Sequence, residues 1–235
     1  MANGLTEINK NLTAPLSKSW ALPIFITREN KYAAGVTLFL FSAVLYLTSN
    51  HFQLFTPQYL PMSWVDRAVP FLPNTVWIYL GEYLLFTTVY INCRDMVNLN
   101  RYIYSFLFLQ TVSVMIFWLW PTTYPREVYP LPDDLNALSY YAFSWLRQAD
   151  TPANCCPSLH VSGVFISSFI FLDEQRLKFP LFFLWASAIA VSTLTTKQHY
   201  LVDVIAGFFM AVIFYWVFRR LVRYRFSSHG AQAKR

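Results

Sequence analysis

Two histidines and one aspartate are the residues whose type and spacing best suit nucleophilic chemistry. His160 follows Pro157 and Ser158 at the start of an apolar run, and His199 lies four residues before Asp203 at the start of another. Positions i and i+4 are neighbours on a helix, so a helical segment would bring Asp203 beside His199. A carboxylate there holds an imidazole in one tautomer and prepares it to act as a nucleophile. We therefore take His199 as the candidate nucleophile and Asp203 as its orienting partner.

The residues around His160 suit the binding of an anion. Pro157 and Ser158 before an apolar run predict a helix start, and the first turn of a helix leaves N–H groups that bind phosphate well. Ser158 adds a hydroxyl, His160 a protonated imidazole, and Arg126 a cation that grips phosphate oxygens in a fork. We expect these groups to meet His199 in one anion-binding, nucleophile-bearing site.

Composition places the site in a membrane protein. The 235 residues are 56% hydrophobic and only 13% charged, whereas a soluble domain carries about a quarter charged residues. The apolar residues form blocks long enough to cross a hydrocarbon core. We predict an all-α, integral membrane six-helix bundle, with spans at roughly 32–49, 68–92, 102–120, 158–172, 179–196 and 200–218.

The distribution of lysine and arginine sets the orientation. With six spans, 14 of the 18 basic residues fall on the side of the two termini and four on the other side. The positive-inside rule then places both termini in the cytoplasm and both histidines at the outer face. The net charge of +6 follows from this asymmetry, so it does not indicate nucleic-acid binding.

We divide the chain into a cytoplasmic N-terminal segment (1–31), one six-span domain (32–225) and a basic C-terminal tail (226–235). The polar first segment does not have the pattern of a signal peptide. A 37-residue outer connection, 121–157, is long enough to suggest a functional role. Within it, residues 138–146 predict a short amphipathic helix lying on the bilayer surface.

No metal and no cofactor is expected. The three cysteines, Cys93, Cys155 and Cys156, form no CxxC or Cys/His spacing typical of a metal site. Glu82 is an acid inside the second predicted span, where it either bonds a neighbouring helix or lines the substrate cavity.

The motifs together resemble a known family. The string Pro157-Ser158-x-His160 followed by His199-x-x-x-Asp203 is similar to the second and third signature motifs of the type 2 phosphatidic acid phosphatase superfamily. The wider strings, Asn154-Cys155-Cys156-Pro157 and Thr196-Lys197-Gln198-His199, look closer to its inositolphosphotransferase branch, the relatives of inositol phosphorylceramide synthase and sphingomyelin synthase.

The resemblance implies a role for each matched residue. His199 would attack phosphorus and become a phosphohistidine, with Asp203 orienting it. His160 would protonate the leaving oxygen and then deprotonate water or an alcohol. Ser158 and Arg126 would hold the phosphoryl oxygens without any metal.

The sequence departs from the family pattern in its cations. The first motif is Lys, six residues, then Arg-Pro; Arg126 fits the arginine, but Leu119 and Glu127 stand at the lysine and proline positions. The third motif begins Ser-Arg, and here it reads Ser192-Thr193. Lys197 is a candidate to replace one missing cation. A phosphomonoester carries close to two negative charges and a diester one, so fewer cations favour headgroup transfer.

The hypothesis from sequence is a membrane enzyme that cleaves a lipid phosphate ester at the outer leaflet through phosphohistidine, as a lipid phosphatase. One alternative is a lipid headgroup phosphotransferase, which differs in whether water or a lipid alcohol reaches the intermediate. An alternative of another class is a noncatalytic lipid-binding or transport protein. The expected partners are a lipid phosphate or phospholipid substrate and the bilayer, and the expected location is a bacterial inner membrane with a periplasmic site.

Overall fold

The computed structural model describes residues 22–150 and 152–222. The first 21 residues and the predicted basic tail 226–235 lie outside this range. The described chain is almost entirely helical, which confirms the predicted all-α class. Its α-helices are α2 (Lys31–His51), α3 (Trp64–Ala68), α4 (Val76–Asn92), α5 (Met96–Leu119), α6 (Ala137–Ala149), α7 (Leu159–Phe169), α8 (Phe179–Thr195) and α9 (Leu201–Leu221).

Each of the six predicted spans overlaps one helix: α2, α4, α5, α7, α8 and α9. Three of these, α2, α5 and α9, are long and apolar enough to cross a membrane. The apolar segment that contains α7 continues through a 3₁₀ turn, Ile170–Leu172, and α8 is apolar but shorter. The amphipathic helix predicted at 138–146 is present as α6.

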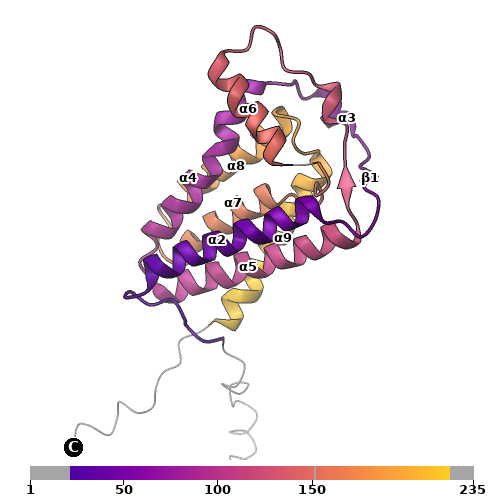
Figure 1. Ribbon diagram of the computed structural model, residues 1–235. Coiled ribbons are helices and arrows are strands. Elements are labelled where there is room, and N and C mark those ends of the chain that lie inside the picture. Colours follow the sequence, from indigo (N-terminus) through magenta and orange to yellow (C-terminus); the bar gives the residue numbers. More distant parts are fainter. Residues whose placement is uncertain (1–21, 151, 223–235) are drawn as a thin grey trace, which may run out of the picture.

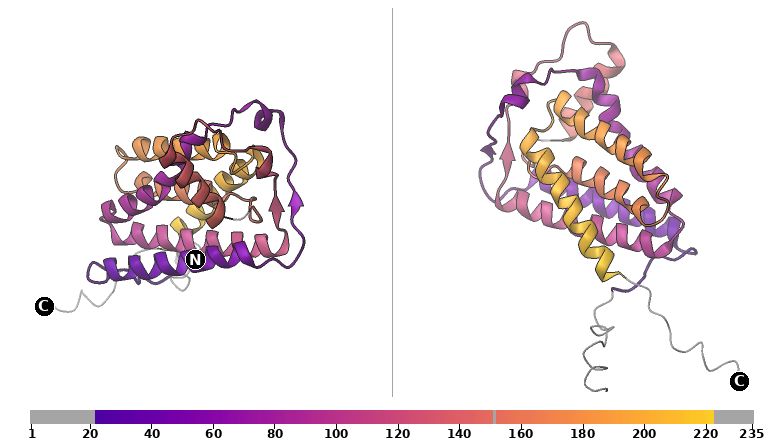
Figure 2. Two further views of the ribbon diagram at one scale, coloured as in Figure 1. Left: turned by 45° about the horizontal axis from the view of Figure 1, so that its top comes forward. Right: turned by 180° about the vertical axis from the view of Figure 1, so that it is seen from behind.

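Helix α7 forms the centre of the molecule (Figures 1 and 2). Its residues from Val161 to Phe169 are all buried, and it packs against α4, α5, α8 and α9. Small residues such as Ser162 and Gly163 let the neighbouring helices approach closely. The hydroxyl groups of this buried helix are satisfied locally; Ser167, for example, donates to the Gly163 carbonyl and contacts the Tyr102 hydroxyl. The helix that carries His160 is therefore held on all sides.

The connections between the helices lie at two opposite ends of the molecule. The start of the described chain meets the end of α9, where the Leu22 N–H donates to the Leu221 carbonyl at 3.1 Å. The long connections that carry α3 and α6 gather at the opposite end (Figure 1). There, a two-residue parallel pairing joins β1 (Gln58–Tyr59) to β2 (Thr122–Thr123). This pairing ties the α2–α4 connection to the α5–α7 connection above the start of α7.

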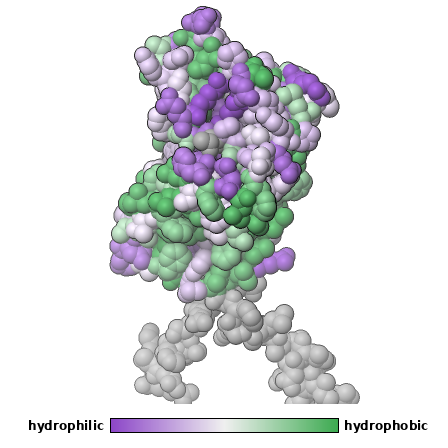
Figure 3. Space-filling view, turned by 45° about the vertical axis from the view of Figure 1, so that its right-hand side comes forward, coloured by the Kyte–Doolittle hydropathy of each residue, from purple (hydrophilic) through white to green (hydrophobic). Residues whose placement is uncertain are grey.

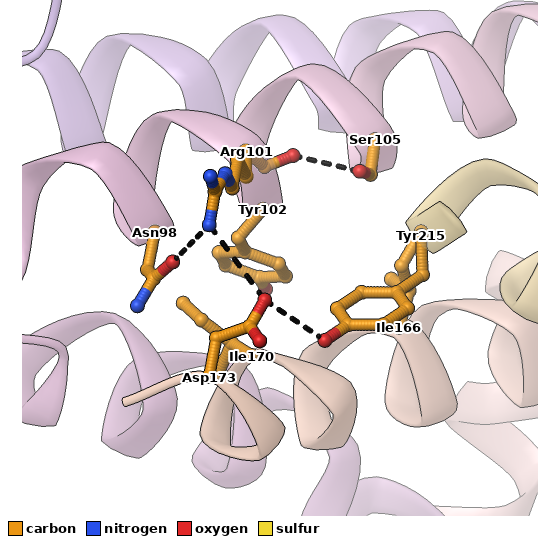
Figure 4. Close-up of a pocket in the computed structure, with 8 residues that line it drawn as sticks. All are labelled: Asn98, Arg101, Tyr102, Ser105, Ile166, Ile170, Asp173 and Tyr215. Atoms are coloured by element: carbon orange, nitrogen blue, oxygen red, sulfur yellow. Dashed lines mark hydrogen bonds and ion pairs between the residues drawn. The ribbon is translucent and has the colours of Figure 1, made fainter. Parts of the chain in front are cut away.

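A polar cluster around Asp173 joins the helices at the end of the molecule where the described chain begins and ends. Arg219 of α9 donates to both oxygens of Asp173, and Arg101 of α5 lies 3.6 Å from one of them. Tyr215 also donates to this carboxylate, and Figure 4 shows Arg101 and Tyr215 approaching it from different helices. The cluster joins α5, α9 and the end of the α7 segment far from the two histidines.

Surface hydropathy follows the same division. In Figure 3 hydrophilic residues gather on the upper part, around a hollow, above a predominantly hydrophobic lower part. Large apolar side chains along α2, including Val36, Phe39 and Val44, are more than half exposed. An apolar belt of this kind matches a lipid environment better than water.

Gly207 of α9 marks the closest approach of α9 to α7. A Cβ added at Gly207 would lie 2.5 Å from the Ser158 carbonyl oxygen, which is backbone and cannot rotate away. By contrast, a Cβ added at Gly81 of α4 would meet only the Trp185 side chain at 3.7 Å, an ordinary contact. The glycine at position 207 is therefore required by packing.

We predict that Gly207→Ala forces α9 away from the start of α7 and destabilises the protein by about 1–3 kcal/mol, the usual range for overpacking. Thermal unfolding in detergent measures this. Gly81→Ala is the matched control and should be neutral or slightly stabilising, because alanine favours a helix over glycine. Equal stability of the two variants would contradict the close approach.

Candidate functional site

His199 and Asp203 form a direct pair. His199 Nδ1 lies 2.7 Å from Asp203 Oδ2, and both side chains are buried. The predicted pairing is present, but its predicted cause is wrong, because α9 begins at Leu201 and His199 precedes the helix. The backbone N–H of His199 donates instead to the Thr193 carbonyl at the end of α8. A turn after α8 thus delivers the histidine, and the first turn of α9 delivers the aspartate.

Lys197 shapes this turn. Its φ of 54° lies in the left-handed region, which reverses the chain after α8. Its ammonium donates to the backbone carbonyls of Asp66 and Val69 at 2.8 and 2.6 Å. The Asp66 carboxylate in turn accepts the Leu201 N–H at the start of α9. Lys197 and Asp66 therefore hold the α8–α9 turn against α3 and its C-terminal cap residue, Val69.

This arrangement bears on the phosphate-binding role considered for Lys197. Burial lowers the pKa of this lysine, and the nearby Asp66 opposes that effect. Its donors already bond two carbonyls, and the ammonium lies over the Tyr129 ring. A role in supporting His199 follows from these contacts, whereas phosphate binding by Lys197 stays a prediction.

His160 faces His199 from the beginning of α7. As predicted, a helix starts here: Ser158 is the N-cap residue, and its hydroxyl oxygen accepts the Val161 N–H at 3.2 Å. His160 Nδ1 lies 3.4 Å from His199 Nε2. The Ser158 N–H donates to the Asp203 carbonyl, which fixes the start of α7 against α9. The two candidate catalytic histidines, 39 residues apart in sequence, are thereby brought face to face.

Helix α4 supplies two further partners to His160. Glu82 Oε1 lies 3.2 Å from His160 Nε2, and the Tyr79 hydroxyl lies 2.6 Å from the same nitrogen. The sequence singled out Glu82 without choosing a role for it, and the structure places it in the site. Tyr79 was missed, although its spacing of three residues from Glu82 puts both on one face of a helix.

Arg126 lies in a buried ion pair. It donates to the Asp150 carbonyl and carboxylate, the latter at 3.1 Å. Tyr46 of α2 donates to the other carboxylate oxygen of Asp150. Within the described residues, Arg126 Nε has no hydrogen-bond partner, so one donor of the guanidinium stays available. Sequence reasoning missed Asp150, because a single acid at the end of a long connection carries no spacing signal.

The electrostatics of the site keep His199 neutral and Asp150 charged. Burial, and next the neighbouring His160, lower the pKa of His199 below its ordinary value. A neutral ring whose Nδ1–H donates to Asp203 leaves a lone pair on Nε2. Burial alone would raise the pKa of Asp150, but the Arg126 guanidinium, and after it His160 and the hydrogen bond from Tyr46, outweigh burial and hold that pKa below its usual range. The site therefore places an uncharged imidazole beside fixed charges.

All three cysteines are free and buried. Across 22–150 and 152–222, no group of three or more His, Cys, Asp or Glu side chains is arranged to hold a metal ion.

Comparison with known families agrees with the motif resemblance at its broader level. A family model described as the PAP2 superfamily, the type 2 phosphatidic acid phosphatases, matches residues 60–217. This range covers more than half of the chain and includes every residue of the site except Tyr46. No curated protein matches the chain.

We predict that Asp150→Asn lowers the free energy of unfolding by about 1.5–3 kcal/mol at neutral pH, because the buried Arg126 loses a charged acceptor. The folded-state pKa of Asp150 is depressed, so its contribution is complete above the unfolded-state value of about 3.9 and is lost as the pH falls through the folded-state value. The difference between variant and wild type should therefore shrink in acid.

Thermal unfolding in detergent between pH 7 and pH 3 measures this difference. Asp134→Asn, an exposed acid on the same connection, is the control and should leave stability unchanged at every pH. A stability loss in Asp150→Asn that did not depend on pH would refute the ion-pair account.

Proposed function

Because the chain belongs to the PAP2 superfamily, we propose that it is a membrane enzyme that cleaves a lipid phosphate ester through a phosphohistidine intermediate, as a lipid phosphatase. The observation that carries this proposal is the pairing of His199 with Asp203 at 2.7 Å, with its other nitrogen facing His160. This is the arrangement that a nucleophilic imidazole and an acid–base partner require.

The proposed reaction has two displacements. His199 Nε2 attacks phosphorus, the ester P–O bond breaks, and protonated His160 gives its Nδ1 proton to the leaving oxygen. Asp203 offsets the positive charge that develops on His199. Water then attacks phosphorus while His160 Nδ1 takes its proton, and the electrons of the N–P bond return to His199. Glu82 stabilises the charged form of His160 that is present at the start of each catalytic cycle.

The phosphoryl oxygens would lie between Arg126 and the start of α7. The free Nε of Arg126 is a buried donor, and Ser158 caps the helix whose first N–H groups suit an anion. Lys197 would contribute mainly through the potential of its charge, since its donors are engaged.

The proposal includes a six-span bundle with both termini in the cytoplasm and the site at the outer leaflet. Three long apolar helices, the exposed apolar face of α2 and the adjacent ends of the described chain support this topology. The site lies at the other end, among the long connections. A bacterial inner membrane with a periplasmic active site fits this orientation.

A second candidate is transfer of a phosphorylated headgroup to a lipid alcohol, as in the inositolphosphotransferase branch. The charges of the site favour it. Arg126 is paired with Asp150, and Glu82 and Asp203 bring two more carboxylates next to the histidines. A phosphodiester, with one negative charge, is accommodated more readily here than a phosphomonoester with close to two.

We predict that purified protein in mixed micelles turns over a labelled lipid phosphate, and that His199→Ala lowers the rate at least 1,000-fold because the covalent step loses its nucleophile. A panel of phosphatidic acid and phosphodiester lipids, each with and without ceramide or diacylglycerol, separates the candidates. Free phosphate indicates a phosphatase, and a new phospholipid indicates a transferase.

His51→Ala, a change at an exposed histidine at the end of α2, is the matched control and should retain full activity. Turnover that survives in His199→Ala would refute the mechanism. Absence of turnover on every lipid would favour the noncatalytic lipid-binding alternative.

We predict that activity survives a chelator and is inhibited by vanadate. No step above uses a metal, and vanadate adopts the five-coordinate geometry of phosphoryl transfer, so it should bind more tightly than substrate. Activity assays with excess chelator and with increasing vanadate measure both effects. Loss of activity in chelator that is restored by an added metal would contradict the proposed chemistry.

A further inference from the structure

His160 Nε2 has two oxygen partners, and both come from α4. The Tyr79 hydroxyl lies 2.6 Å from this nitrogen, and Glu82 Oε1 lies 3.2 Å from it. Tyr79 is 1% exposed, and its ring also packs on the imidazole, with centroids 4.6 Å apart. An aromatic nitrogen presents either one N–H or one lone pair in its plane, so it cannot satisfy both partners in the same way at once.

The donors and acceptors can be assigned by elimination. The Tyr79 hydroxyl has its one hydrogen-bond partner, among the described residues, in His160 Nε2. A buried O–H without an acceptor is costly, so Tyr79 donates to this nitrogen, which then carries the lone pair. The His160 proton consequently lies on Nδ1, directed at His199 Nε2. An ionised Glu82, in contrast, accepts only from a protonated Nε2.

We propose that Tyr79 is a positioning residue that sets the tautomer of the neutral His160 ring. Tyr79 donates to Nε2 when that nitrogen is bare, and Glu82 accepts from it when it is protonated. The two α4 side chains thus give Nε2 a partner in both charge states. When the ring is neutral, donors align in one chain from Tyr79 through His160 and His199 to Asp203.

The groups that face His160 allow this arrangement. They come from every element around the ring, and those that titrate or carry charge are Tyr46, Tyr79, Glu82, Arg126, Asp150 and His199. Arg126 and Asp150 offset each other as an ion pair. The Tyr46 hydroxyl donates to Asp150, and its ring lies perpendicular to the imidazole, with centroids 6.2 Å apart. Tyr79 and Glu82 therefore decide whether Nε2 is bare or protonated.

The structural claim can be tested without any turnover. With ¹⁵N-histidine labelling in detergent, imidazole nitrogen shifts report which nitrogen carries the proton, and the chain has only four histidines. Without substrate, and at a pH at which His160 is uncharged, we expect His160 and His199 both to carry the proton on Nδ1. In Tyr79→Phe the proton of His160 should move to Nε2, toward Glu82, while His199 is unchanged.

Tyr83→Phe makes the same change on the same helix, at a half-exposed tyrosine, and should leave every histidine signal in place. Loss of the His160 signals in His160→Gln assigns them. If the neutral ring of wild-type His160 carries its proton on Nε2, or if Tyr79→Phe leaves that tautomer unchanged, the proposal is overturned.

The consequence for rate rests on the proposed function, in which protonated His160 is the acid. Tyr79 stabilises the neutral ring, so Tyr79→Phe should move the alkaline limb of the pH–rate profile upward by about one pH unit. Glu82→Gln should move it downward, because the carboxylate that stabilises the charged ring is gone. A uniform loss of rate in Tyr79→Phe without any shift would make Tyr79 a packing residue. An inactive wild type with the expected tautomers would instead count against the proposed function alone.

Discussion

The site depends on the close approach of α7 and α9, because each of the two facing histidines belongs to a different part of the chain. The approach is possible only since Gly207 presents no side chain to the Ser158 carbonyl. The Ser158 N–H then donates to the Asp203 carbonyl, so the residue that caps α7 is bonded to the residue that orients His199. A shift of either helix would separate the 3.4 Å contact between the histidine nitrogens.

The supporting contacts are polar groups buried in an apolar surrounding. Lys197, Asp66 and Arg126 each neutralise or satisfy a partner outside the histidine pair. An unpaired charge at this depth would cost several kcal/mol, so these pairings constrain the loops strongly. They also bring together connections that the chain order separates widely, such as the α2–α4 connection and the α8–α9 turn. The positions of the site residues thus depend on the pairing of buried charges and hydrogen-bonding groups as much as on apolar packing.

The carboxylates distinguish the two histidines. Asp203 bonds Nδ1 of His199, and Glu82 can accept a hydrogen bond from Nε2 of His160 when that ring is charged. Since burial keeps His199 neutral, the same neighbourhood contains one ring suited to attack and one suited to carry a proton. The difference arises from the element that supplies each partner: α9 for His199, the proposed nucleophile, and α4 for His160, the proposed proton carrier.

The sequence by itself determined the helical class, the helix start at Ser158, the pairing of His199 with Asp203 and the family. These follow from local signals: long apolar blocks, a capping residue before an apolar run, and two motifs at fixed spacing. Only the tertiary structure decided that His199 precedes α9, that Lys197 bonds carbonyls of α3 and its C-terminal cap, and that Arg126 pairs with Asp150. It also decided that Glu82 and Tyr79 contact His160. The physical reason is that these partners lie 24 to 131 residues apart, and which buried charge meets which donor depends on how the helices pack.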